Sequence, residues 1–219
     1  MSSVAIVIED ALSEGVIRRL IHHTHRDWTV GVRYPLHLLA GGRSNPRNVE
    51  ERRGLSGFGQ IKVQMPAFNN LAKLRPIIVL TDLDVHVQCP GDLWGKWMPN
   101  VTKHPNLILR VAIKEVEAWL LADRDNMADL LSISVGNMPA YPEALADPKI
   151  EIVNLARNSP SDEVKHALVP VHGSTAEVGR SFDTTLAHFA RNTWDIDAAV
   201  KTSNSLNRAV KALKSFKFT

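Results

Sequence analysis

The 219-residue chain holds one cysteine, Cys89, and few aromatic residues, which make up 6% of it. A lone cysteine excludes a disulfide framework and a cysteine-rich zinc module, and it fits a reducing, cytoplasmic setting. No apolar run approaches the roughly 20 residues of a membrane span, so we expect no membrane segment. The formal net charge is only +3, and that total does not identify a nucleic-acid-binding protein.

Apolar residues make up 44% of the chain and charged residues 22%, as in an average folded protein. The length suits one large domain, or one domain with a helical extension. Charge is spread unevenly, since residues 201–219 carry five bases and no acid. Such a stripe is typical either of a phosphate-binding surface or of the solvated face of a terminal helix.

Four short runs rich in aliphatic residues predict strands, at residues 4–8, 29–33, 76–81 and 107–112. Helical patterns lie between and after them, including residues 58–74, which Pro66 is expected to kink or break, 93–98 and 115–122. This alternation predicts an α/β fold with a mostly parallel, Rossmann-like sheet flanked by helices.

From about residue 124 the pattern is helical only, with segments expected at residues 127–131, 150–156, 184–190 and 206–213. We therefore expect a sheet domain over residues 1–123 and a helical C-terminal extension over residues 124–219.

Acidic residues follow three of the four expected strands: Glu9, then Asp82 and Asp84, then Glu115 and Glu117. Because the carboxyl ends of parallel strands meet at one edge of a sheet, where ligands bind, these acids are expected to converge. Converging carboxylates repel one another unless a cation binds, and Mg²⁺ or Mn²⁺ takes oxygen ligands of this kind. Acids at strand ends also cap the helices that follow, and this structural role stays open for each of them.

The same acids are the candidate catalytic residues. Glu9, Asp82 and Asp84 are expected to be metal ligands and catalytic groups, and Glu9 could instead act as a general base through water. Glu117 is favoured over Glu115 as a further ligand, because the neighbouring Ala118 suits a packed helix face.

Two segments resemble the metal-binding motifs of the Toprim superfamily, which includes topoisomerase and primase metal domains and the OLD-family nucleases. The first is Ile6, Val7, Ile8 and Glu9 with a helix after it, and the second runs from Val79 to Asp84. A third segment, from Glu115 to Asp123, resembles a hallmark of small bacterial Toprim-like proteins that are often encoded beside an ATPase and suspected of phage defence.

The resemblance implies a Toprim-like domain and a divalent-metal-dependent nuclease of DNA or RNA, working in defence with a partner ATPase. One departure stands out: Asp10 takes the place of the usual Gly after the first Glu. An acidic pocket that has lost its activity is therefore the alternative, in a non-catalytic binding or adaptor module.

Basic residues near these motifs are the candidate nucleic-acid contacts, because bases bind backbone phosphates. They are four arginines of a Gly-rich loop and one lysine beside the acids: Arg43, Arg47, Arg52, Arg53 and Lys114. Glu50 and Glu51 halve the charge of the loop, so an ordinary solvated loop is an equal alternative. The oligomeric state is left open.

Overall fold

The computed structural model describes residues 2–35, 57–82 and 93–217. Four strands form one sheet, β1 (Ser2–Ile8), β2 (Trp28–Pro35), β3 (Ile77–Asp82) and β4 (Leu107–Ala112). Their order is β2-β1-β3-β4, and every neighbouring pair is parallel. The expected α/β fold with a parallel sheet is confirmed.

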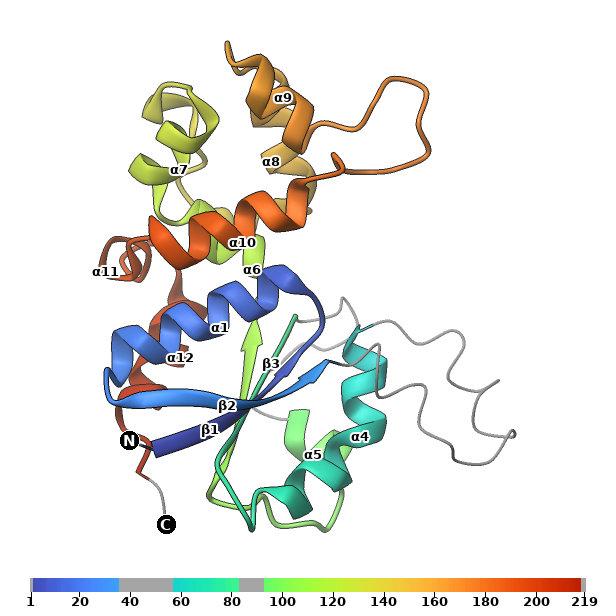
Figure 1. Ribbon diagram of the computed structural model, residues 1–219, viewed down its shortest axis with the longest axis vertical. Helices are drawn as coiled ribbons and strands as arrows, with labels where there is room; N and C mark the ends of the chain where they lie inside the picture. The colour runs from blue at the N-terminus through green and yellow to red at the C-terminus, as the bar shows by residue number, and fades with distance from the viewer. Residues whose placement is uncertain (1, 36–56, 83–92, 218–219) are drawn as a thin grey trace.

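Helices cover both faces of the sheet (Figure 1). One face packs against α1 (Ala11–Thr24) and α12 (Asn204–Lys214), and the other against α4 (Gly57–Leu71) and α5 (Leu93–Trp97). Side chains of β1 alternate between these layers, since Ile6 joins the α1 side and Val7 the α4 side. Burial on both faces explains why the central strands read as continuous apolar runs.

The strand order reverses direction between β1 and β3. The chain leaves β1 through α1 to reach β2 on one side, and then returns through α4 to β3 on the other side of β1. In parallel sheets such a reversal opens a crevice at the carboxyl ends of the two strands, and ligands bind there. The residues that follow β1 and end β3 therefore flank the most favourable place for a site.

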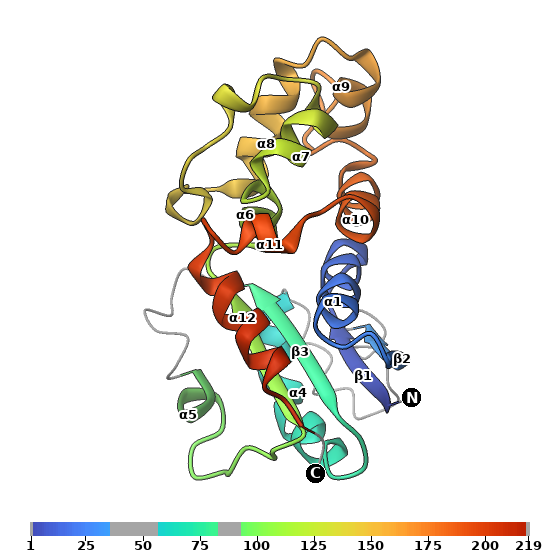
Figure 2. The same cartoon turned by 90° about the vertical axis from the view of Figure 1, so that its left-hand side faces the viewer.

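The rest of the chain is helical and packs above the carboxyl edge of the sheet (Figures 1 and 2). It comprises α6 (Val116–Leu121), α7 (Arg124–Leu131), α8 (Pro148–Arg157), α9 (Asp162–Leu168), α10 (Phe182–Asn192) and α11 (Ile196–Ala199), with short 3-10 turns at Val135–Asn137 and Pro142–Ala144. α10 lies along α1, and one hydrophobic core joins both helices to the sheet. That core runs across residue 123 without interruption, whereas the division of the chain there stays a prediction.

Two details differ from the sequence expectations. α4 continues on both sides of Pro66 instead of ending there, because Met65 and Phe68 are buried against the sheet and hold the helix in place. α9 and α11 were not expected, since both are short and show little apolar periodicity. Within the described ranges, no helix has the length and hydropathy needed to cross a membrane.

Candidate functional site

Glu9 and Asp10 follow β1 directly, at the reversal of the strand order. Asp10 is the N-cap of α1: its Oδ1 accepts the Ser13 N–H at 2.7 Å, and the Ser13 Oγ accepts the Asp10 N–H at 3.2 Å. This capping box directs the Asp10 carboxylate to the start of α1. Glu9 is half-buried beside it.

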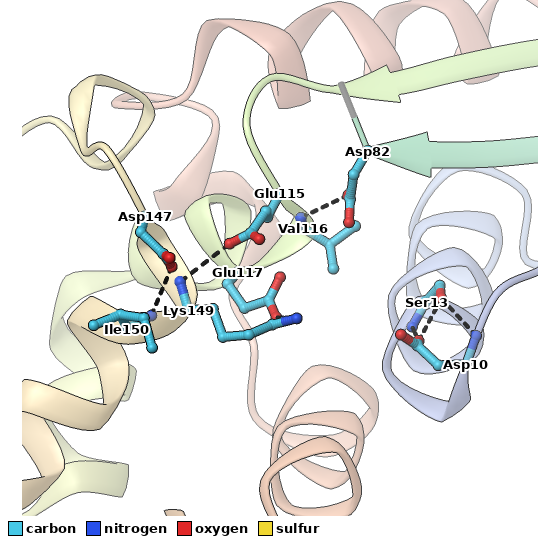
Figure 3. A network of polar contacts seen from close by, with 9 residues as sticks. All are labelled: Asp10, Ser13, Asp82, Glu115, Val116, Glu117, Asp147, Lys149 and Ile150. Carbon is cyan, nitrogen blue, oxygen red and sulfur yellow. Dashed lines mark hydrogen bonds and ion pairs between the residues drawn. The ribbon is translucent and has the colours of Figure 1, made fainter. Parts of the chain in front are cut away.

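Asp82 ends β3, in register with Ala112 of β4. Its Oδ1 accepts the N–H of Val116, the first residue of α6, at 2.9 Å (Figure 3). The N-cap residue of α6, Glu115, makes no such bond with its own side chain. Asp82 therefore caps a helix that begins 34 residues later in the chain, and this bond fixes α6 against the sheet edge.

The Asp82 carboxyl group lies in a negative environment. Burial raises its pKa well above the usual value, and the charges of Glu117 and Glu9 raise it further. The acids that follow β1, β3 and β4 are thus close enough to repel one another, as the sequence predicted. A group in this position holds a proton or requires a nearby cation.

Glu115 bridges to another helix. Its Oε2 accepts the N–H of Lys149, in the first turn of α8, at 3.2 Å, while Asp147 caps the next N–H, of Ile150, at 2.8 Å (Figure 3). Pro148 has no N–H to satisfy, so these two acids complete the start of α8. Glu115 therefore caps α8, which begins far along the chain, and not the helix that follows it.

Glu117 is the most buried acid of the group, with 2% of its surface exposed. Burial raises its pKa to about 7, and the charge of Glu115 adds to the effect while the Lys149 ammonium opposes it. Lys149 Nζ lies 3.6 Å from Glu117 Oε1, and Figure 3 shows the lysine side chain reaching from α8 toward α6. Glu117 lies among the acids of this edge, and its role as a metal ligand stays a prediction.

The positive charge nearest to these carboxylates is the ammonium group of Lys149. Burial works against its charge, but the carboxylates around it, first Glu117 and then Glu115, raise its pKa. Asp183, at the start of α10, completes the group: burial and the charge of Asp10 raise the Asp183 pKa, and Lys149 opposes them. We call the set Glu9, Asp82, Glu115, Glu117 and Lys149 the acidic site.

The chemistry of the acidic site fits a hard divalent cation, because buried carboxylates in mutual repulsion gain from added positive charge. The side chains as placed do not form a complete ligand shell: within the described ranges, no three His, Cys, Asp or Glu side chains are grouped so that they could hold a metal ion. Asp84, the remaining predicted ligand, lies outside the described residues.

Of the predicted nucleic-acid contacts, one lies within the described residues and four lie outside them. Lys114 is exposed and has a positive φ of 69°, at the bend between β4 and α6. The four loop arginines lie outside the described residues: Arg43, Arg47, Arg52 and Arg53. Asp123, in the Toprim-like third segment, is buried and accepts bonds from Asn126 Nδ2 at 2.9 Å and Asp195 N–H at 2.6 Å, so it joins helices rather than the site.

Lys149 and Asp183 were missed by the sequence analysis, since both lie in the region read only as helical. One signal was present for Lys149. Asp147 and Pro148 mark a helix start, and a lysine in a first helical turn is opposed by the helix dipole. The Lys149 side chain is stabilised there by the carboxylates of Glu117 and Glu115.

Comparisons of the chain with protein-family models, with curated proteins and with solved structures give no match.

Proposed function

We propose that the protein is a divalent-metal-dependent phosphodiester hydrolase acting on DNA or RNA, with its active centre at the acidic site. One observation carries the proposal: Asp82, at the reversal point of a parallel sheet, lies in the field of the buried Glu117 and of Glu9, and Lys149 is the ion-pair partner of Glu117. Mg²⁺ or Mn²⁺ is the cation that oxygen ligands of this kind select. The Toprim resemblance supports the same assignment.

The residues would divide the work as follows. Asp82 and Glu117 would hold the cation together with Asp84, and Glu9 would accept the proton of the attacking water. The cation would supply positive charge opposite the phosphoryl group. Lys149, 37% exposed in its side chain, would neutralise a substrate phosphate. A partner ATPase would control access to the substrate.

The direct test is cleavage of plasmid, single-stranded DNA and RNA by the full chain with Mg²⁺ or Mn²⁺, and with EDTA as the blank. We expect metal-dependent cleavage that Glu9→Gln and Asp82→Asn each reduce by at least about 10²-fold, the scale of losing a group that acts on the transition state. Asp129→Asn, on an exposed position of α7, is the matched control and should cleave normally. Cleavage that survives both site substitutions would rule out this active centre.

A second function, a non-catalytic adaptor with a vestigial acidic site, is favoured by a different observation. Asp82 and Glu115 both accept backbone N–H groups of helix starts, and Lys149 already neutralises Glu117. In that case the carboxylates are structural and Lys149 replaces the metal. Calorimetric titration with Mn²⁺ separates the two functions, because only the hydrolase requires a saturable metal site that Asp82→Asn removes.

A further inference from the structure

A row of basic side chains lies on the outer side of α12 and continues onto the β4 edge of the sheet. We call it the α12–β4 basic surface, made of Lys103, Arg110, Lys114, Arg208 and Lys211. We propose that this surface binds the phosphate backbone of a nucleic acid. None of its residues belongs to the predicted arginine loop.

The helical part of the surface follows from the geometry of α12. Its buried residues, Ser205, Leu206, Ala209, Val210 and Leu213, form one stripe. Arg208 and Lys211 are exposed and lie on the opposite side, one helical turn apart. No acid occurs between residues 201 and 219, so α12 has no carboxylate of its own, and the Glu143 carboxylate beside it lies at its first turn.

The edge part lies next to α12 in space. Figure 2 shows α12 lying lengthwise beside β4, and the Ile113 N–H, just after β4, donates to Ser205 Oγ in the first turn of α12 at 3.4 Å. Lys114 is therefore beside the start of α12, at the end nearest the acidic site. Lys103, whose Nζ donates to the Leu107 carbonyl at 3.1 Å, marks the other end of β4.

Arg110 distinguishes this surface from a merely solvated helix face. Its Nε is buried and has no hydrogen-bond partner among the described residues. Burial lowers its pKa, and burial together with the charge of Arg110 lowers the pKa of Lys103. In the described part of the chain, no carboxylate lies within ion-pair distance of any member of the surface. A partly desolvated guanidinium with no carboxylate beside it is costly, and the negative charge of a phosphate would neutralise it.

The chemistry of the surface favours a nucleic acid over a membrane. A membrane-surface helix exposes an apolar face that enters the lipid, whereas Leu206, Val210 and Leu213 of α12 are all buried in the core. What α12 presents is a line of positive charge, which matches the regular line of negative charge on a duplex.

Binding at this surface does not depend on the acidic site. It uses none of its acids and needs no metal, so it extends the proposed function without resting on cleavage. Because Lys114 is next to Glu115, a nucleic acid held along α12 would lead toward the acidic site.

The test is fluorescence anisotropy of labelled duplex DNA and duplex RNA with the full chain, in EDTA, between about 50 and 200 mM KCl. The variant is Arg208→Gln with Lys211→Gln. Its matched control is Lys62→Gln with Lys73→Gln, two exposed lysines on or beside α4, which covers the opposite face of the sheet. Both pairs are exposed, and a thermal melt checks that each variant is folded.

Each phosphate contact makes the plot of the logarithm of the association constant against the logarithm of the salt concentration steeper by about 0.9. For two lost contacts we expect this negative slope to become shallower by about 2, and duplex DNA affinity at 0.1 M salt to be roughly sixtyfold weaker. The control should bind as the wild type. The duplex that binds more tightly identifies DNA or RNA as the ligand. Equal affinities of variant, control and wild type, or binding to anionic vesicles without binding to either duplex, would overturn the proposal. EDTA prevents metal-dependent cleavage during the binding measurement. A protein that binds duplex through this surface, but does not cleave any substrate when metal is added, contradicts only the proposed function.

Discussion

Replacing Glu117 by Gln tests the electrostatic basis of the acidic site, because it removes a buried charge and keeps the size of the side chain. The folded-state pKa of Glu117 is about 7, against an ordinary value of 4.5. The folded protein therefore holds a proton that the unfolded chain releases between pH 4.5 and 7. Since the folded state binds more protons in this window, the free energy of unfolding falls as the pH rises through it.

The magnitude follows from the two pKa values. A difference of about 2.5 corresponds to about 3 kcal/mol of destabilisation once the pH exceeds 7. The Gln variant escapes this cost, and it also removes the Glu117 charge that raises the Asp82 pKa. The attraction of Lys149 is already contained in the pKa of about 7, since it lowers the pKa of Glu117. We expect Glu117→Gln to be about 3 kcal/mol more stable than the wild type at about pH 8 without metal.

Urea denaturation of both proteins, at pH values from about 4 to 8 in EDTA, measures the effect. The stability difference should be near zero at the acidic end and grow toward the alkaline end. The control is Glu177→Gln, the same substitution at an exposed position between α9 and α10. A Glu117→Gln variant that is less stable than the wild type at the alkaline end, or a difference that is constant with pH, would refute the reasoning.

Two stability predictions concern the helical packing around the site. Gly15→Val should lower the unfolding free energy by about 1–3 kcal/mol in urea denaturation, because a Cβ on Gly15 would lie 3.0 Å from the Ala187 carbonyl oxygen. The control for helix propensity is Gly95→Val, where a Cβ meets nothing within 4 Å. Equal losses in the two variants would contradict the close contact of α1 with α10. Glu143→Ala should lower the unfolding free energy by about 1–3 kcal/mol in the same assay, because the Glu143 carboxylate accepts the Ser205 N–H at 2.9 Å and so caps α12. Glu143→Gln keeps one acceptor oxygen and should lose less stability. Equal losses in the two variants would argue against the cap.

The layers of the fold could be read from the sequence. β1, β3 and β4 are short aliphatic runs because both their faces are buried, and no other element of this length gives that pattern. The helix expected between the first two strands is α1, and Asp10 caps it. The order of the strands was not readable, because the sequence gives the succession of β1, α1 and β2 but not the side of β1 on which β3 pairs.

The acidic site was predicted in part. The positions of Glu9, Asp82 and Glu117 after successive parallel strands were enough to expect them at one edge, because parallel strands end on the same side. Which carboxylates cap helices was not predictable. Asp82 accepts an N–H from α6 and Glu115 one from α8, each 34 residues away in sequence, and side-chain spacing carries no information on such contacts.

The sequence by itself determined which segments form the buried strands and which edge of the sheet is acidic, since each depends on residues close together in the chain. Only the tertiary structure decided that Lys149 reaches Glu117 and that Arg110 is covered beside α12. Both contacts depend on where α8 and α12 lie relative to the sheet, and packing across the whole core sets those positions. The charge of the acidic site, and with it the proposed chemistry, is a property of that packing.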